Sequence, residues 1–320
     1  MYEPDRVIVL LSTHNGEQFL DQQVSSIMNQ SKRVDRILVR DDGSTDSTPE
    51  ILRRLALNKS CVEVVEFGRK PLGFGPSFAE LMREARTRPG TYYLFADQDD
   101  VWLSNKVEIT VNTLRKLEEA GTVPSLVCTN SEVVNEELET LHASLPGNVR
   151  RKTPTLRRVV VSSEEVGVLG HTMGFNRSLL EAMPLPIPDD IYAHDLWTVL
   201  SALALGKVQY VDVVTARYRQ HEQQTAGFFN PTAAGWLGSL LHLNHTVDAM
   251  RNEELMRAQQ CNAVLAHFLE QLSPQDEQFL SRFCTIINAN FCRRRWAYLG
   301  LFRSGELSWH RHSLARLFLA

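Results

Sequence analysis

The amino-acid sequence predicts an α/β protein, with a mostly parallel sheet flanked by helices and a C-terminal helical appendage. Over the first 130 residues, short β-branched and aliphatic runs alternate with segments whose apolar residues recur at helical spacing. The connections between these segments are short, which is typical of parallel strands linked by helices that cover the sheet. After about residue 230 the pattern is helical to the end of the sequence.

Strands and helices are expected in strict alternation in this first part of the chain. We expect strands at Val7–Ser12, Arg36–Arg40, Val62–Phe67, Tyr92–Ala96 and Ser125–Thr129. We expect helices at Glu17–Gln30, Thr48–Leu57, Ser77–Arg86 and Lys106–Ala120. Ser77 is a candidate N-cap of its helix, because a serine hydroxyl can accept a hydrogen bond from a free N–H of the first turn.

The alternating pattern breaks between Glu136 and Thr155, where a basic segment with prolines is typical of a surface loop. Regular structure is expected again as helices at Asn176–Met183 and Leu196–Leu205, and as a strand at Val208–Val213. We therefore predict one domain over residues 1–225, with halves 1–130 and 131–225, and a helical region over residues 226–320.

The composition is that of an ordinary soluble protein. Charged residues make up 22% of the chain and the net charge is -4, which argues against a nucleic-acid-binding protein. The five cysteines are Cys61, Cys128, Cys261, Cys284 and Cys292. No two of them have the C-x-x-C spacing of a zinc or redox site. We expect reduced thiols in a cytoplasmic protein, because neither a signal peptide nor an apolar run of roughly 18 to 20 residues is present.

An acidic segment, Asp97-Gln98-Asp99-Asp100, directly follows the fourth expected strand. Carboxylates this close together repel one another, and a fold tolerates them where a cation neutralises the charge. Hard divalent ions such as Mg²⁺ and Mn²⁺ bind carboxylate oxygens and then phosphate oxygens. The segment therefore predicts a metal site, with a solvated acidic turn as the alternative.

Other polar segments follow expected strands or begin a helix. They are Ser12-Thr13-His14-Asn15, Asp41-Asp42-Gly43-Ser44-Thr45-Asp46, His194-Asp195-Leu196-Trp197 and Tyr218-Arg219-Gln220-His221. Ligands of open α/β sheets gather at the carboxyl ends of the strands, so these segments are candidates for one site. Three of them have a structural alternative: a loop with a helix cap at Asp46, an N-cap at Asp195, and a structural histidine at His221.

Taken together, the order and spacing of these segments resemble the inverting family 2 glycosyltransferases of the GT-A fold over about residues 5–225. The segment Gly170–Arg177, with His194–Trp197 and Tyr218–His221, is similar to a bacterial rhamnosyltransferase-like branch that builds surface polysaccharide. One segment departs from the family pattern: Gly73-Phe74-Gly75-Pro76 stands where asparagines are often found. The contacts usually made there are therefore not carried over to this chain.

The resemblance implies a nucleotide-diphosphate sugar donor, carried by dTDP or UDP, in the half 1–130, and an acceptor in the half 131–225. Asp42, with Ser12, would hold the pyrimidine, and His171 would shape the sugar pocket. The predicted nucleotide-sugar-binding residues are Ser12, Asn15, Asp42, Asp97, Gln98, Lys106 and His171.

The resemblance also implies the catalytic groups. Asp99 would be the main protein ligand of Mg²⁺ or Mn²⁺, His221 would be a second ligand, and Asp195 would be the general base. An acceptor hydroxyl must lose its proton as it attacks the anomeric carbon, so a carboxylate is needed on the acceptor side. A cation offsets the charge that develops on the leaving diphosphate.

The expected reaction moves L-rhamnose from dTDP-rhamnose to a hydroxyl of a growing, lipid-linked cell-surface glycan. The alternatives are another donor sugar (galactose, glucose or an N-acetylhexosamine), a nucleotidyltransferase, and a non-catalytic binding module. The first strand is not followed by the glycine-rich, basic phosphate loop expected of a nucleotidyltransferase, and binding alone needs no base such as Asp195.

Residues 291–320 combine six arginines with many aromatic and aliphatic side chains and one acid, Glu306. Such a composition suits a helix lying on anionic lipid, at the cytoplasmic face of the inner membrane. A helix packed on the catalytic domain, with its basic face in water, is the alternative.

Overall fold

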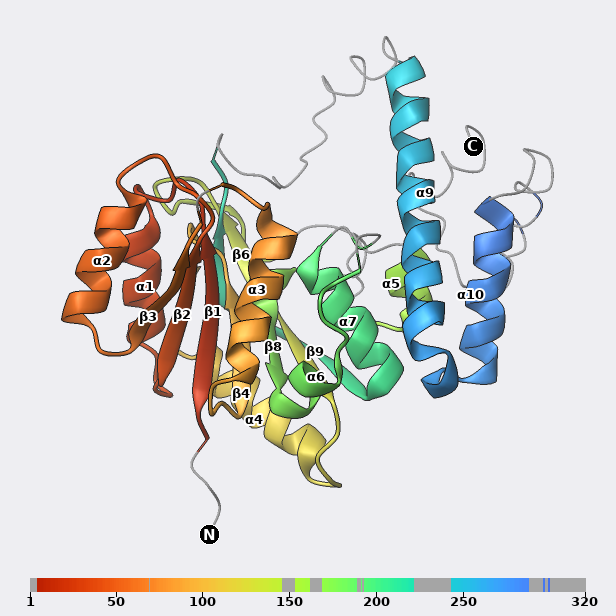
Figure 1. Ribbon diagram of the computed structural model, residues 1–320, viewed down its shortest axis with the longest axis horizontal. Coiled ribbons are helices and arrows are strands. Elements are labelled where there is room, and N and C mark those ends of the chain that lie inside the picture. Colours follow the sequence, from red (N-terminus) through yellow and green to blue (C-terminus); the bar gives the residue numbers. More distant parts are fainter. Residues whose placement is uncertain are drawn as a thin grey trace.

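The computed structural model describes residues 5–68, 70–145, 153–161, 169–188, 191, 193–221, 243–287, 296 and 299. Strands among these residues form one mixed sheet in the order β3-β2-β1-β4-β8-β6-β9-β5, and β7 pairs with β6 (Figure 1). Figure 1 also shows helices in layers beside the sheet, with α9 and α10 side by side at the end of the molecule away from α1 and α2.

The sheet is parallel in its first half and mixed in its second. The strands are β1 Val7–Thr13, β2 Arg36–Asp41, β3 Val62–Phe67, β4 Tyr92–Ala96, β5 Val101–Trp102, β6 Ser125–Val134, β7 Thr140–His142, β8 Met173–Asn176 and β9 Lys207–Arg219. Strands β1 to β4 pair in parallel, as do β6 and β9. Strand β8 runs antiparallel between β4 and β6, so it joins the two parallel parts.

The helices cover both faces of the sheet. They are α1 Leu20–Met28, α2 Thr48–Asn58, α3 Phe74–Arg86, α4 Lys106–Glu118, α5 Leu156–Val161, α6 Arg177–Ala182, α7 His194–Leu205, α9 Leu243–Phe268 and α10 Pro274–Ile287. Successive residues of β1 enter opposite cores: Ile8 packs in the core that contains α3 and α7, and Val9 in the core that contains α1, α2 and α4. Burial on both faces explains why β1 is apolar at nearly every position.

Helix α3 begins earlier than the sequence predicted. It starts at Phe74 and its N-cap is Gly73, so the prediction of Ser77 as the N-cap is wrong. Gly73 has a φ of 91°, which favours glycine at this position. Pro76 lies in the first turn, where its missing N–H leaves no bond unmade. Ser77 is instead buried within the helix and faces β1 and β2.

Strand β9 is longer than predicted and ends at Arg219. Tyr218 and Arg219 therefore belong to the strand, and only the residues that follow them lie in the loop that the sequence suggested. The expected C-terminal helical appendage is confirmed by α9 and α10 within residues 243–287. Phe268 of α9 packs on Trp197 of α7 with ring centroids 5.3 Å apart. None of the helices in the described ranges is long and apolar enough to cross a membrane. Apart from Trp296 and Leu299, the basic segment 291–320 lies outside the described residues.

Candidate active site

The acidic turn, Asp97–Asp100, lies at the carboxyl end of β4, and its three carboxylates differ in how far they are buried. The side chain of Asp97 is 38% exposed, that of Asp99 14% and that of Asp100 0%. Burial, with Asp99 and Asp195 nearby, raises the pKa of Asp97 to about 7. Burial, with Asp99 and Asp97 nearby, also raises the pKa of Asp100. The turn is therefore poorly suited to hold three negative charges without a cation.

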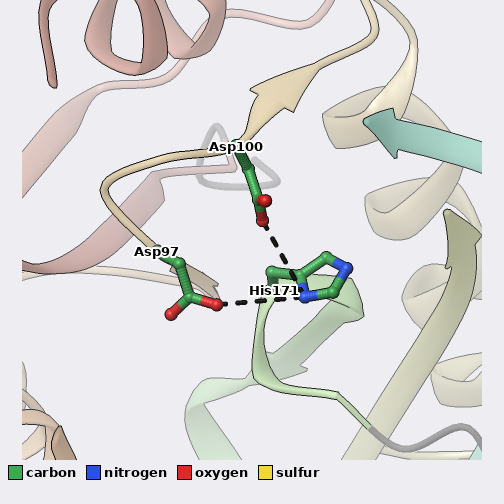
Figure 2. Close-up of side chains that lie close together, drawn as sticks. All are labelled: Asp97, Asp100 and His171. Carbon is green, nitrogen blue, oxygen red and sulfur yellow. Dashed lines mark ion pairs between the residues drawn. The ribbon is translucent and has the colours of Figure 1, made fainter. Parts of the chain in front are cut away.

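One group of metal-binding atoms combines Asp97, Asp100 and His171, whose ligand atoms all lie within 4.8 Å of one another (Figure 2). Nδ1 of His171 is 3.9 Å from Oδ2 of Asp97 and 3.8 Å from Oδ2 of Asp100. Oδ2 of Asp100 is buried and has no hydrogen-bond partner among the described residues. Carboxylate oxygens are ligands of Mg²⁺ and Mn²⁺, and an imidazole nitrogen is a ligand of transition-metal ions, so this group fits a divalent cation.

The imidazole of His171 is held in the form that a metal ligand needs. Burial, followed by the charge of Lys106, lowers the pKa of His171 to about 3, so the ring is neutral. Its Nε2 lies 2.8 Å from Oγ of Ser131, and its ring stacks on Tyr218 with centroids 4.6 Å apart. These contacts fix the ring and leave Nδ1 facing the two carboxylates.

A second group combines the two residues that the sequence assigned to the metal. Nε2 of His221 lies 2.9 Å from Oδ2 of Asp99, although 121 residues separate them in sequence. His221 follows the end of β9, and its ring packs against Phe19, with centroids 5.1 Å apart. The structure thus brings Asp99 and His221 together, while their role as metal ligands stays a prediction.

Lys106 lies beneath the acidic turn, at the start of α4. Its side chain is fully buried, lies over the Trp102 ring and donates from Nζ to Oγ1 of Thr215 at 3.3 Å. Burial lowers the pKa of Lys106 to about 7, against the raising effect of Asp100. This position suits an internal counter-charge to the acidic residues. Direct contact with the nucleotide sugar remains a prediction.

Asp42 already accepts several hydrogen bonds. Its carboxylate accepts from Nη1 of Arg40 at 2.5 Å, from the backbone N–H of Leu72 at 2.9 Å and from that of Gly73 at 2.8 Å. Arg40 also donates to Ser77, whose hydroxyl lies 2.6 Å from that of Ser12. The two residues predicted to hold the pyrimidine are therefore linked through Arg40 and Ser77. A base that binds Asp42 must replace contacts from the segment 72–73.

Asn15 and Gln98 hold neighbouring loops together. Oδ1 of Asn15 accepts from the N–H of Thr45 at 2.8 Å, which links the loops after β1 and β2. Oε1 of Gln98 accepts from the N–H of His14 at 2.7 Å, and its Nε2 donates to the carbonyl of the same residue at 2.9 Å. Both residues thus shape the predicted site, and their contact with a donor stays a prediction.

Asp195 lies in the first turn of α7. The N-cap of this helix is Ala193, so the structural alternative of Asp195 as the N-cap is wrong. The carboxylate accepts from the N–H of Gly170 at 3.0 Å and from that of Leu196 at 2.7 Å. Burial raises the pKa of Asp195, against the lowering effect of these N–H groups. A carboxylate with a raised pKa holds a proton more readily than an ordinary one, and the role of Asp195 as the general base stays a prediction.

The sequence analysis assigned no individual role to several residues around this site. Asp100 was read only as part of the acidic segment, yet it is the most deeply buried of the three carboxylates. Ser131 and Arg219 contact His171 and the acidic turn, respectively. His194 is buried and stacks on Phe78, with centroids 3.8 Å apart. No local pattern marks such residues, because their partners lie far away in the sequence.

Comparisons with known proteins show which proteins this chain resembles. A family model described as Glycosyl transferase family 2 matches residues 8–183. The dTDP-rhamnosyl transferase RfbG of Shigella flexneri is 25% identical over 224 residues, which cover 68% of this chain and 73% of that protein. An uncharacterized glycosyltransferase of Haemophilus influenzae is 25% identical over 229 residues, covering 70% of this chain and 68% of that protein.

Solved structures of S. aureus TarS share the fold. TarS 1-349 in complex with UDP-GlcNAc matches with a TM-score of 0.59 and 16% identity, covering 98% of this chain and 78% of that chain. The complex of the same fragment with UDP matches with a TM-score of 0.57 and 17% identity, covering 87% of this chain and 70% of that chain. The expected GT-A-like architecture is thereby confirmed.

Proposed function

The chain belongs to glycosyl transferase family 2, and from this premise we propose that it is an inverting, metal-dependent glycosyltransferase. The proposed reaction transfers L-rhamnose from dTDP-rhamnose to a hydroxyl of a growing cell-surface glycan. One observation carries the proposal: Asp195 accepts a hydrogen bond at 3.0 Å from the N–H of Gly170, and the next residue, His171, lies 3.9 Å from the carboxylate of Asp97. A metal-binding group and a candidate base thus meet in one site.

Asp195 is the proposed general base. The oxygen of the acceptor hydroxyl attacks the anomeric carbon, its proton passes to the Asp195 carboxylate, and the bond from the sugar to the diphosphate breaks. The raised pKa of Asp195 favours uptake of this proton in the transition state. A single displacement of this kind inverts the anomeric centre and requires no covalent enzyme intermediate.

The proposed cofactor is Mg²⁺ or Mn²⁺, with Asp99 and His221 as its ligands. When bound, the ion would offset the charge that develops on the leaving diphosphate. The group of Asp97, Asp100 and His171 is a second candidate for holding it, because its donors also fit a divalent ion. The contact between Asp99 and His221 supports the first assignment, since it places both side chains at one point.

The donor is proposed from relatives. RfbG is named a dTDP-rhamnosyl transferase, which supports rhamnose, whereas TarS was solved with UDP-GlcNAc, which keeps an N-acetylhexosamine, galactose or glucose as the alternatives. The test incubates the protein with dTDP-rhamnose and a panel of UDP-sugars, with Mn²⁺ or with a chelator, and measures thermal stabilisation and release of the nucleotide. Ligands that bind the folded state raise its melting temperature by mass action.

The outcomes separate the alternatives. Stabilisation by dTDP-rhamnose with Mn²⁺, together with slow release of dTDP, is the expected result. Stabilisation by a UDP-sugar alone would replace rhamnose with another donor. Release of pyrophosphate from a nucleoside triphosphate and a sugar phosphate would indicate a nucleotidyltransferase. Binding without any turnover, when glycan acceptors are supplied, would indicate a binding module.

We further propose that residues 291–320 place the enzyme at the cytoplasmic face of the inner membrane, where a lipid-linked acceptor would be found. The six arginines of this segment support the proposal. Replacing Arg293, Arg294 and Arg295 by glutamine removes three charges, each worth about 1 kcal/mol at an anionic surface. We expect less sedimentation with anionic liposomes and no change with neutral ones. An intact protein that ignores anionic liposomes at low salt would contradict this location.

A further inference from the structure

The end of β9 is fastened to the acidic turn by one buried arginine. The side chain of Arg219 is 2% exposed, although an arginine is rarely buried without partners. Its Nε donates to the backbone carbonyl of Asp99 at 2.7 Å, and its own N–H donates to Oδ1 of Asp100 at 3.2 Å. Arg219 therefore contacts the turn by its backbone and by its side chain.

The other groups of Arg219 reach two further segments. Nη1 donates to the carbonyl of Glu136, in the loop between β6 and β7. Nη2 donates to Oε1 of Gln22, on α1, at 2.5 Å. The planar guanidinium also lies over the Phe19 ring, 4.4 Å from its centroid. One side chain thus ties the acidic turn to α1 and to the loop after β6.

Phe19 connects this arrangement to His221. The ring of Phe19 contacts the guanidinium of Arg219 and also packs on the imidazole of His221. His221 in turn lies against the carboxylate of Asp99. A shift of the Arg219 side chain would therefore move both partners of the Asp99–His221 pair, one through its backbone carbonyl and the other through the Phe19 ring.

We propose that Arg219 is a positioning residue that sets the distance and orientation between Asp99 and His221. Arg219 contacts no substrate atom. It holds the side chains of Asp99 and His221 where they can share one cation. The inference rests on the proposed function, because the shared cation belongs to that function. It adds a residue that lies behind the ligands and orients them.

Arginine suits this role because of its shape. The three donor directions of its side chain reach acceptors on three segments, and its flat face covers an aromatic ring. Lysine keeps the charge but has a single nitrogen on a flexible chain, so it cannot make these contacts together. Arg219→Lys therefore tests geometry at constant charge.

The experiment titrates Mn²⁺ into the full-length protein in the presence of dTDP or UDP, whichever the unaltered protein binds, and measures nucleotide affinity by calorimetry. We expect Arg219→Lys to need at least about tenfold more Mn²⁺ for half-maximal nucleotide binding, as for other residues that orient metal ligands. Nucleotide binding in a chelator should be unchanged. An effect that appears with Mn²⁺ but not in a chelator distinguishes a positioning role from a general loss of structure.

Arg86→Lys is the matched control. Arg86 also donates to backbone carbonyls, those of Leu180 and Met183, but it lies at the end of α3. It should lose stability like Arg219→Lys and keep the Mn²⁺ dependence of the unaltered protein. If Arg219→Lys and the unaltered protein show equal Mn²⁺ dependence, the positioning role of Arg219 is overturned, while the proposed metal-dependent function is not. An unaltered protein that gains nothing from Mn²⁺ would instead overturn the proposed metal-dependent function.

A milder variant covers the case in which Arg219→Lys does not fold. Gln22 is exposed, and Gln22→Met removes only the acceptor of Nη2. The loss of one such hydrogen bond should raise the required Mn²⁺ concentration about threefold. An unchanged requirement in Gln22→Met, with Arg219→Lys unfolded, would assign Arg219 to folding and overturn the proposal.

Discussion

A single substitution at Asp195 can show whether this carboxylate acts as a general base or has only a structural role. Asn at this position keeps one oxygen that accepts a hydrogen bond but cannot take up the acceptor proton. We predict that Asp195→Asn keeps its melting temperature and donor affinity, and that kcat falls about 10²–10⁴-fold. Asp276→Asn is the control, because Asp276 also lies in the first turn of a helix, α10. A near-normal kcat for Asp195→Asn, measured with donor and acceptor, would sink the assignment.

A second set of variants distinguishes the two candidate metal-binding groups. We predict that Asp99→Ala lowers turnover about 100-fold or more, because a bound cation contributes several kcal/mol to the transition state. His221→Ala should have the same sign and a smaller effect. Both variants should weaken Mn²⁺-dependent nucleotide binding in calorimetry. If His171→Ala and Asp100→Asn remove this binding while Asp99→Ala does not, the cation belongs to the other group.

Where a family motif supplied residues, the sequence named groups that the structure brings together, and their roles stay predictions. Asp99 and His221 were paired through the family resemblance, and the structure brings them together. The contact of Asp100 with His171 was not predicted, because no spacing rule links positions 71 residues apart. Asp42 was expected to hold the pyrimidine, and the hydrogen bonds that it accepts from Leu72 and Gly73 could not be foreseen because they depend on how one loop folds.

At the scale of elements, β8 joins the two parallel parts of the sheet and depends on Gly174. A Cβ at this position would lie 2.3 Å from Cγ2 of Thr110 on α4 and 3.2 Å from Cγ of Leu94 on β4. We predict that Gly174→Ala lowers the free energy of unfolding by about 1–3 kcal/mol, through overpacking. Chemical denaturation measures this loss.

A compensating variant identifies the cause of that loss. Thr110→Ser removes Cγ2 and keeps the hydroxyl, so the double variant with Gly174→Ala should regain part of the stability. Additive losses in the double-mutant cycle would contradict overpacking against Thr110. The sequence could not predict β8, because a strand of four residues is too short to show a period. Strands β1 to β4 were predicted because they are apolar runs between helical patterns.

At the scale of the whole molecule, the acidic turn makes stability depend on pH. The pKa of Asp97 is raised to about 7 in the folded protein, above its usual value near ~3.9. Below about pH 4 both states are protonated, and as the pH rises towards 7 the unfolded state loses its proton first. Without metal, the contribution of Asp97 to stability is therefore lost between these values.

We predict that the melting temperature in a chelator falls between pH 5 and pH 8 by more for the unaltered protein than for Asp97→Asn. Mn²⁺ should reduce this fall, because metal ligands must be deprotonated and the ion stabilises them in that form. Differential scanning calorimetry at both pH values measures the effect. An equal fall in the two proteins would show that Asp97 titrates normally.

The core shared by α7 and α9 limits where segments of this protein can be exchanged with those of its relatives to make chimeras. Phe268 and Val264 of α9 pack in the same core as Trp197, on the helix that carries Asp195. A chimera that exchanges only the residues after β9 would place foreign side chains against Trp197 and disturb the helix that carries Asp195. Hybrid proteins should therefore exchange α7, β9, α9 and α10 as one block, with the crossover point before His194.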